Sequence, residues 1–176
     1  MLKQAGIVPA RIVAPEVDET PRKGELPRAY ALRLAVAKAE AVAETERGAL
    51  ILAADTVVAC GRRILPKAET PEEVERCLRL LSGRRHQVLT ALALIAPEEK
   101  IRTRIVTTRV AFKVLTPLEI ADYVASGEGF DKAGGYAIQG RAEAFVRFIN
   151  GSYSNVVGLP LHDTLSLLGG QRLFAS

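Results

Sequence analysis

The chain has 176 residues, 48% hydrophobic and 25% charged, which is typical of a soluble globular protein and predicts a single domain over residues 1–176. The longest apolar stretches, near 49–60 and 89–97, are too short to cross a bilayer, and no secretory signal follows Met1, so we expect a cytoplasmic protein that does not bind membranes. Lys and Arg exceed Asp and Glu by four, which suits a small anionic substrate better than a nucleic acid.

The first third of the chain predicts a helix between two strands. The apolar pair at 12–13 predicts a short strand that runs into a polar loop. The Ala- and Leu-rich segment 26–46 predicts a helix. Segment 49–59 is apolar except for Asp55 and predicts a buried strand, and 61–63 predicts a hairpin turn after it.

Two capping boxes with proline at the first helical position predict further helices. They start at 70–73 and 116–119, and glycines are expected to end the helices at Gly83 and Gly127. Two β-rich segments, 87–96 and 102–113, are expected to pair as antiparallel strands. The remaining elements, a strand, a loop and a final helix, are expected at 144–149, 151–155 and 160–168. Helices and strands alternate, so we expect an α/β fold with a mixed sheet.

Asp55 is the most informative residue of the predicted buried strand. An unpaired carboxylate there costs several kcal/mol unless a metal, a base or strong donors meet it, which favours a functional role. The alternative is an Asp that caps a loop or pairs with an arginine. Cys60 and Cys77 are expected to be reduced, and the distant pair His86 and His162 gives no zinc ligand set, so any metal would be a hard cation held by oxygen.

Other polar residues leave alternatives open. Asp18 and Glu19 alone would be solvated surface acids. Lys38 could lie along an apolar helix face with its ammonium outward, or could bind phosphate, and Lys67 is equally ambiguous.

Three further segments stand out by composition. The basic group 84–86 is interpreted as cations at a helix C-terminus. The glycines of 132–140 would let Lys132 and Gln139 approach a phosphate or a base, although the spacing of a Walker loop or a dinucleotide fingerprint is not present. Ser154 or Asn155 could cap the last helix region.

Seven segments, in order, match a known family. They are 17–20 (VDET), 35–39 (AVAKA), 53–58 (AADTVV), 64–67 (ILPK), 81–88 (LSGRRHQV), 131–140 (DKAGGYAIQG) and 151–161 (GSYSNVVGLPL). Over essentially its whole length the chain resembles the Maf (septum formation inhibitor) family of nucleoside triphosphate pyrophosphatases. The resemblance implies hydrolysis between the α and β phosphates, with a divalent metal cation, Mg²⁺ or Mn²⁺, as cofactor.

The resemblance also assigns roles by position. Asp55 and Glu19 would be the catalytic carboxylates that bind the metal, with Asp55 binding metal or activating the attacking water. The substrate-binding residues would be Lys38, Thr56, Lys67 and Gln139. These types suit phosphoryl chemistry, which needs an oriented water and positive charge on the departing pyrophosphate.

Within the family, 54–56, 136–140 and 151–155 look like the branch acting on dTTP and UTP and unlike the 7-methyl-GTP branch. The resemblance implies a Maf/ITPase-like elongated mixed β-sheet flanked by helices, with two lobes around a nucleotide cleft, and allows a homodimer. The expected function is house-cleaning of surplus or modified pyrimidine nucleotides.

The chain departs from the family pattern at its start, where a first strand and a loop with phosphate-binding Ser and Arg residues are expected and are missing. Either the gene starts upstream or this is a short form with impaired catalysis. Pro66 and Ala68 are smaller departures around Lys67. The alternative function is therefore a nonenzymatic nucleotide-binding or cell-division regulatory protein. A nucleic-acid binder is suggested only by the pI of about 9.3.

Overall fold

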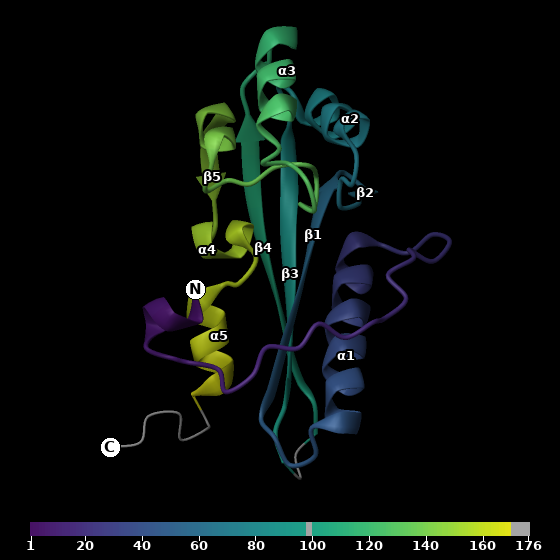
Figure 1. Cartoon of the computed structure of the whole chain (residues 1–176), viewed down its shortest axis with the longest axis vertical. Coiled ribbons are helices and arrows are strands. Elements are labelled where there is room, and N and C mark those ends of the chain that lie inside the picture. The colour runs from purple at the N-terminus through teal and green to yellow at the C-terminus, as the bar shows by residue number, and fades with distance from the viewer. Residues whose placement is uncertain (98–99, 170–176) are drawn as a thin grey trace.

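The computed structural model describes residues 1–97 and 100–169. Figure 1 shows an elongated molecule built on a five-stranded sheet in the order β2-β1-β3-β4-β5. The strands are β1 (Ile51–Cys60), β2 (Arg63–Leu65), β3 (Arg85–Ile95), β4 (Arg102–Phe112) and β5 (Val146–Asn150). The predicted α/β class and the antiparallel pairing of β3 with β4 are confirmed.

The prediction of a mixed sheet is wrong, because each neighbouring pair of these strands is antiparallel. β1 turns directly into β2, and β3 is followed directly in the sheet by β4. Short connections of this kind join antiparallel strands, whereas parallel neighbours need a crossover connection. Alternation of helices and strands along the sequence therefore did not determine strand direction.

The helices are α1 (Pro27–Thr45), α2 (Pro71–Leu81), α3 (Pro117–Ser126), α4 (Tyr153–Val157) and α5 (Leu161–Leu168), with 3₁₀ turns η1 (Leu2–Ala5) and η2 (Arg141–Phe145). The predicted caps of α2 and α3 are confirmed: the side chains of Thr70 and Thr116 accept from the backbone N–H of Glu73 and Glu119. The loop predicted at 151–155 is corrected, since most of it belongs to α4.

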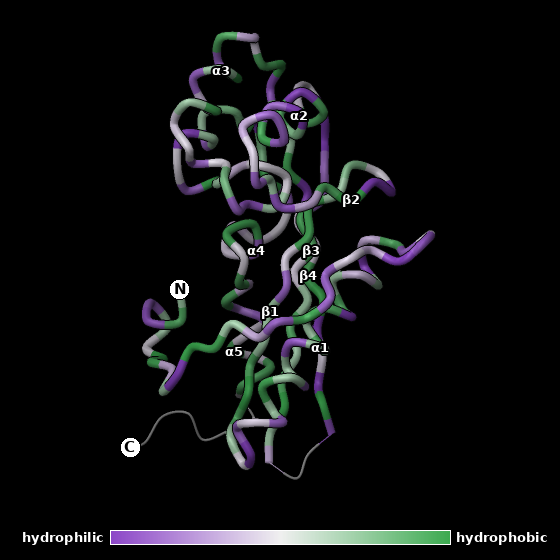
Figure 2. Tube along the Cα trace, turned by 45° about the vertical axis from the view of Figure 1, so that its right-hand side comes forward, coloured by the Kyte–Doolittle hydropathy of each residue, from purple (hydrophilic) through white to green (hydrophobic). Residues whose placement is uncertain are grey.

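The strand predicted at 12–13 is also wrong. The segment has no regular secondary structure, and Ile12 is 88% exposed. Figure 2 shows the N-terminal segment crossing the lower half of the molecule before it reaches α1. Two apolar residues are too few to predict a strand, since strands usually contain three to ten residues.

Hydrophobic clusters occupy the two ends of the sheet. At one end, residues of α2 and α3 such as Leu78 and Tyr123 pack on Val110. At the other end, α1 packs on one face and α5 on the opposite face, with Leu34 and Leu167 in the two clusters. Figure 1 shows these helices at opposite ends of the long strands. The middle of β1, which contains Asp55, therefore lies between the clusters.

Two features of the described residues bear on the expected location and redox state. None of the helices there is long and apolar enough to cross a membrane. Cys60 and Cys77 are free thiols, as predicted, and Cys77 is buried.

Candidate functional site

Asp55 lies in the middle of β1 and is only 7% exposed. Its Oδ1 accepts a hydrogen bond of 2.6 Å from the Nζ of Lys38, which α1 carries across from the strand. The partner of Asp55 is therefore a lysine and not an arginine. A cationic partner lowers the free-energy cost of burying a charged carboxylate.

Glu19 completes the charged group. Its Oε1 lies 2.7 Å from the same Nζ of Lys38, and its Oε2 lies 3.3 Å from the Nζ of Lys67. The Lys38 ammonium thus sits between two carboxylates that are 36 residues apart in the sequence. Lys38 does not extend to solvent, because its side chain is 17% exposed and its charged end is paired on both sides.

Burial and charge act in opposite directions on these groups. Burial raises the pKa of Asp55 above its usual value, although Lys38 partly opposes this. Burial alone would lower the pKa of Lys38, but its bonds to Asp55 and Glu19 prevail and raise it. For Glu19 burial also works toward a higher pKa, and the two lysines outweigh it and lower the pKa. Lys38 and Glu19 therefore stabilise each other's charged forms, whereas burial works against the charged form of Asp55.

Two cavities adjoin this charged group along β1. One, of about 280 Å³, is lined by Lys38, Asp55, Thr56, Lys67 and Gln139, among others. The other, of about 210 Å³, shares Asp55, Thr56 and Lys67 and adds Glu19. The sequence-predicted site residues therefore line two cavities that share Asp55, Thr56 and Lys67. They come from the loop before α1, from α1, from β1, from the segment after β2 and from the loop after α3.

The side chain of Thr56 points to the face of β1 opposite to that of Asp55, since successive strand residues point to opposite faces. Its Oγ1 lies 2.9 Å from Oγ1 of Thr90 and donates to the carbonyl of Gly158 at 3.3 Å. Asn155, which is fully buried, donates from Nδ2 to the carbonyl of Val88 and to Oγ1 of Thr108, each at 3.0 Å. These bonds hold the segment 152–158 against the sheet, and its residues 156–158 form one wall of the 280 Å³ cavity.

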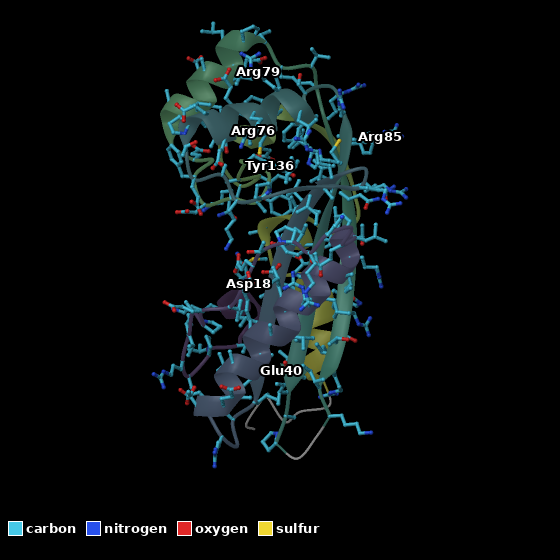
Figure 3. The ribbon with its side chains drawn as sticks, turned by 90° about the vertical axis from the view of Figure 1, so that its right-hand side faces the viewer. Asp18, Glu40, Arg76, Arg79, Arg85 and Tyr136 are labelled. Atoms are coloured by element: carbon cyan, nitrogen blue, oxygen red, sulfur yellow. The ribbon has the colours of Figure 1, made fainter. Side chains whose placement is uncertain are left out.

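The glycine-rich segment 132–140 forms another wall, and Lys132, Tyr136 and Gln139 all line the same cavity. Gly134 and Gly135 have φ near +70°, and a Cβ at Gly134 would meet Val58 Cγ1 at 2.8 Å, so glycine is needed there for close packing on β1. Tyr136 is buried, and its hydroxyl lies 2.8 Å from Nε2 of His86. Figure 3 shows Tyr136 and Asp18 on one side of the sheet and Arg85 pointing to the other.

The interpretation of 84–86 as a cationic cap is wrong for His86. The residue lies in β3 and is 2% exposed, and burial lowers its pKa to about 4, so it is neutral at physiological pH. Neither Ser154 nor Asn155 is the N-cap of α5, which is Pro160, but Oγ of Ser154 accepts from the backbone N–H of Leu161, the first residue of that helix. Asn155 instead makes the buried contacts described above.

The donor set fits a hard divalent cation. Asp55 and Glu19 already share one cation, the Lys38 ammonium, so their oxygen atoms converge. Within residues 1–97 and 100–169 no cluster of three or more His, Cys, Asp or Glu side chains is placed to hold a metal. Mg²⁺ is commonly bound by only one or two carboxylates, with water and substrate phosphates supplying the other ligands.

Two residues that contact the loop of Glu19 escaped the sequence analysis. Tyr30 and Arg33 of α1 donate to backbone carbonyls of the loop that carries Glu19. A signal was present, because Tyr30, Leu34 and Lys38 recur at helical spacing and so share a face. The partner loop, however, could not be identified from that spacing.

The chain is similar in sequence to known proteins. The sequence model of the family described as Maf-like protein matches residues 1–171. A protein of Rhodopseudomonas palustris (strain ATCC BAA-98 / CGA009) named dTTP/UTP pyrophosphatase is 59% identical over 177 residues, which cover 97% of this chain and 86% of that protein. Proteins of the same name from Nitrobacter winogradskyi and Sphingopyxis alaskensis are 56% and 58% identical, cover 98% and 96% of this chain, and are themselves covered to 86% and 88%.

Proposed function

Because the chain belongs to the Maf family, we propose that it is a nucleoside triphosphate pyrophosphatase that hydrolyses dTTP and UTP to the monophosphate and pyrophosphate. Relatives named dTTP/UTP pyrophosphatase at 56–59% identity support the choice of substrates. The observation that carries the proposal is the position of Lys38 between the carboxylates of Asp55 and Glu19 at the two cavities. This group pairs oxygen ligands for a metal with cations for a triphosphate.

In the proposed reaction, water attacks phosphorus, the bond between the α and β phosphates breaks, and a proton leaves the water. Asp55 would orient this water and accept its proton as a general base. A divalent cation, Mg²⁺ or Mn²⁺, held by Asp55 and Glu19 would offset charge on the phosphates. Lys38 and Lys67 then face the triphosphate and stabilise the negative charge that develops on the departing pyrophosphate.

Gln139 is the proposed contact to the base. Its side chain is exposed and lines the 280 Å³ cavity that also contains Lys67 and Asp55. A carboxamide offers one acceptor oxygen and two N–H donors, which match the N–H donor and carbonyl acceptors on the edge of uracil or thymine. Thr56 is proposed to support the site by fixing Gly158 in the opposite wall.

The test compares Asp55→Asn with Asp122→Asn, which makes the same chemical change on an exposed position of α3. We expect Asp55→Asn to lower kcat for dTTP and UTP by about 10² or more, while Asp122→Asn leaves it unchanged. Asp55→Asn should still bind the nucleotide, because it removes a negative charge near the phosphates. Wild-type turnover in Asp55→Asn would contradict the role proposed for Asp55. Binding of dTTP by the wild-type protein without any turnover would contradict the proposed activity and favour a nucleotide-binding regulator.

The cellular setting is part of the same proposal. We place the activity in the cytoplasm, where it would remove surplus or modified pyrimidine nucleotides. The homodimer that the family resemblance allows remains a prediction, which light scattering coupled to gel filtration tests directly.

A further inference from the structure

The loop that carries Glu19 has no regular secondary structure to hold it. Residues 6–26 include no helix or strand, and Asp18 and Thr20, the neighbours of Glu19, are exposed. Yet the Glu19 carboxylate has to stay within reach of Lys38, because the proposed metal site needs both carboxylates together. Some other interaction must therefore fix the backbone at this point.

Three successive backbone carbonyls of this loop accept hydrogen bonds from two side chains of α1. Arg33 donates from Nη1 to the carbonyl of Asp18 at 3.2 Å and from Nη2 to that of Thr20 at 3.0 Å. Tyr30 donates from its hydroxyl to the carbonyl of Glu19 at 2.6 Å. The loop is thus bound to α1 on both sides of Glu19 and at Glu19 itself.

The two donors are themselves held in place. Glu25 accepts from Nε and Nη2 of Arg33, each at 2.8 Å, and the guanidinium lies 5.4 Å from the centre of the Tyr30 ring. The side chains of Arg33 and Glu25 are 19% and 9% exposed, so this is not a loose surface ion pair. A two-pronged arginine–carboxylate contact restricts the rotation of both side chains.

Arg33 does not belong to the charged group itself. In the part of the chain that the structure describes, it is absent from the lining of both cavities that contain Asp55, whereas Lys38, five residues further along α1, lines one of them. Tyr30 lines the smaller cavity beside Glu19, but its hydroxyl is engaged with the Glu19 backbone. Neither contact brings Arg33 to the reacting groups.

We propose that Arg33 and Tyr30 are positioning residues that clamp the backbone of residues 18–20 to α1 and so keep the Glu19 carboxylate beside Asp55 at the divalent-cation site. The inference rests on the proposed function, and it assigns to these residues a role in the affinity of the site for the divalent cation. α1 then fixes Glu19 twice, through its backbone by Arg33 and Tyr30 and through its carboxylate by Lys38. Loss of groups that orient metal ligands typically lowers metal affinity 10- to 100-fold.

The test uses two conservative variants. Arg33→Lys keeps the charge but loses the forked donor geometry, and Tyr30→Phe removes a single hydroxyl. Arg28→Lys, at an exposed position on the same helix, is the matched control. For both clamp variants we expect the Mn²⁺ concentration that half-saturates dTTP hydrolysis to rise about tenfold or more, while kcat at saturating Mn²⁺ falls by less than about threefold.

A second readout does not depend on turnover. Hydrogen exchange of the nucleotide-free protein should become faster at the amides of Thr20 and Arg22, which donate to Asp18 and Glu25, in Arg33→Lys and Tyr30→Phe, with exchange in β3 unchanged. Unchanged exchange in this loop, or an unchanged Mn²⁺ requirement in an active variant, would overturn the clamp. If the wild-type protein fails to hydrolyse nucleotides, the proposed function falls, and the exchange experiment still decides whether the loop is clamped.

A double-variant comparison separates positioning from general stability. In a Glu19→Gln background the metal ligand is already lost, so adding Arg33→Lys should change the Mn²⁺ requirement by less than about twofold. An additional tenfold rise in that background would show that Arg33 acts independently of Glu19 and would contradict the proposal.

Discussion

Replacement of Lys38 by methionine should destabilise the protein and should make its stability depend on divalent metal. The substitution removes the ammonium from Asp55, whose side chain is 8% exposed, and leaves a buried carboxylate unpaired beside Glu19. Breaking a buried pair in this way costs about 3 to 5 kcal/mol. The Glu19 contact adds little, because that side chain is 37% exposed and screened by solvent. We therefore expect the free energy of unfolding to fall by about 3 kcal/mol, or the Tm by about 6 to 12 °C.

The assay is urea unfolding of Lys38→Met in EDTA and in excess Mn²⁺, with Lys23→Met at an exposed position as the matched control. A divalent cation can replace the missing ammonium, and a ligand at a hundred times its Kd stabilises by about 2.7 kcal/mol. Mn²⁺ should therefore restore most of the loss in Lys38→Met and stabilise the wild type less. The reasoning is refuted if Lys38→Met costs no more than Lys23→Met in EDTA, or if Mn²⁺ stabilises both variants equally.

Three further outcomes follow from the same contacts. In the metal-free protein the Asp55 carboxyl should titrate at higher pH than an ordinary aspartate, because burial raises its pKa; a midpoint at or below pH 3.8 in an NMR titration of the side-chain carbon would contradict this. The free energy of unfolding should fall by up to about 3 kcal/mol as the pH drops from 6.5 to 4. Over this range His86 becomes protonated in the unfolded chain, whereas in the folded protein its pKa is about 4. Urea titrations of His86→Gln should show a smaller decrease of the unfolding free energy with pH. Lys67→Ala should lower kcat/KM for dTTP about tenfold or more through loss of a charge-assisted phosphate contact, with Lys23→Ala unchanged in the same steady-state assay.

Elements with local signals could be predicted from the sequence. The N-caps Thr70 and Thr116 determine their helix starts within a few residues, because the side-chain contacts that define them lie within one turn, although a complete capping box forms only at Thr116. The buried strand around Asp55 could be predicted for a similar reason, since a long apolar run has to be covered on both faces. Asp55 stood out within it as a charge with no local partner.

Elements that depend on tertiary contacts could not be predicted. The directions of β1 against β3 and of β4 against β5 could not be predicted, because helices separate these strands in the sequence. His86 is neutral because it is buried, and its partner Tyr136 lies fifty positions away. The family resemblance assigned Glu19 and Lys38 to one site, but it did not predict that they form an ion pair. The Arg33 contacts to the Glu19 loop had no sequence signal beyond helical spacing, because a donor that binds backbone carbonyls leaves no mark in the residue types of its partner.

The measurement that tests the central claim most directly is identification of the products formed from dTTP by the wild-type protein with Mg²⁺ or Mn²⁺. We expect one pyrophosphate for each dTMP and no release of orthophosphate, with formation of both products lost in Asp55→Asn. Formation of dTDP and orthophosphate would place the cleavage at another bond, and products that persist in Asp55→Asn would place it at another site; either result would contradict the account.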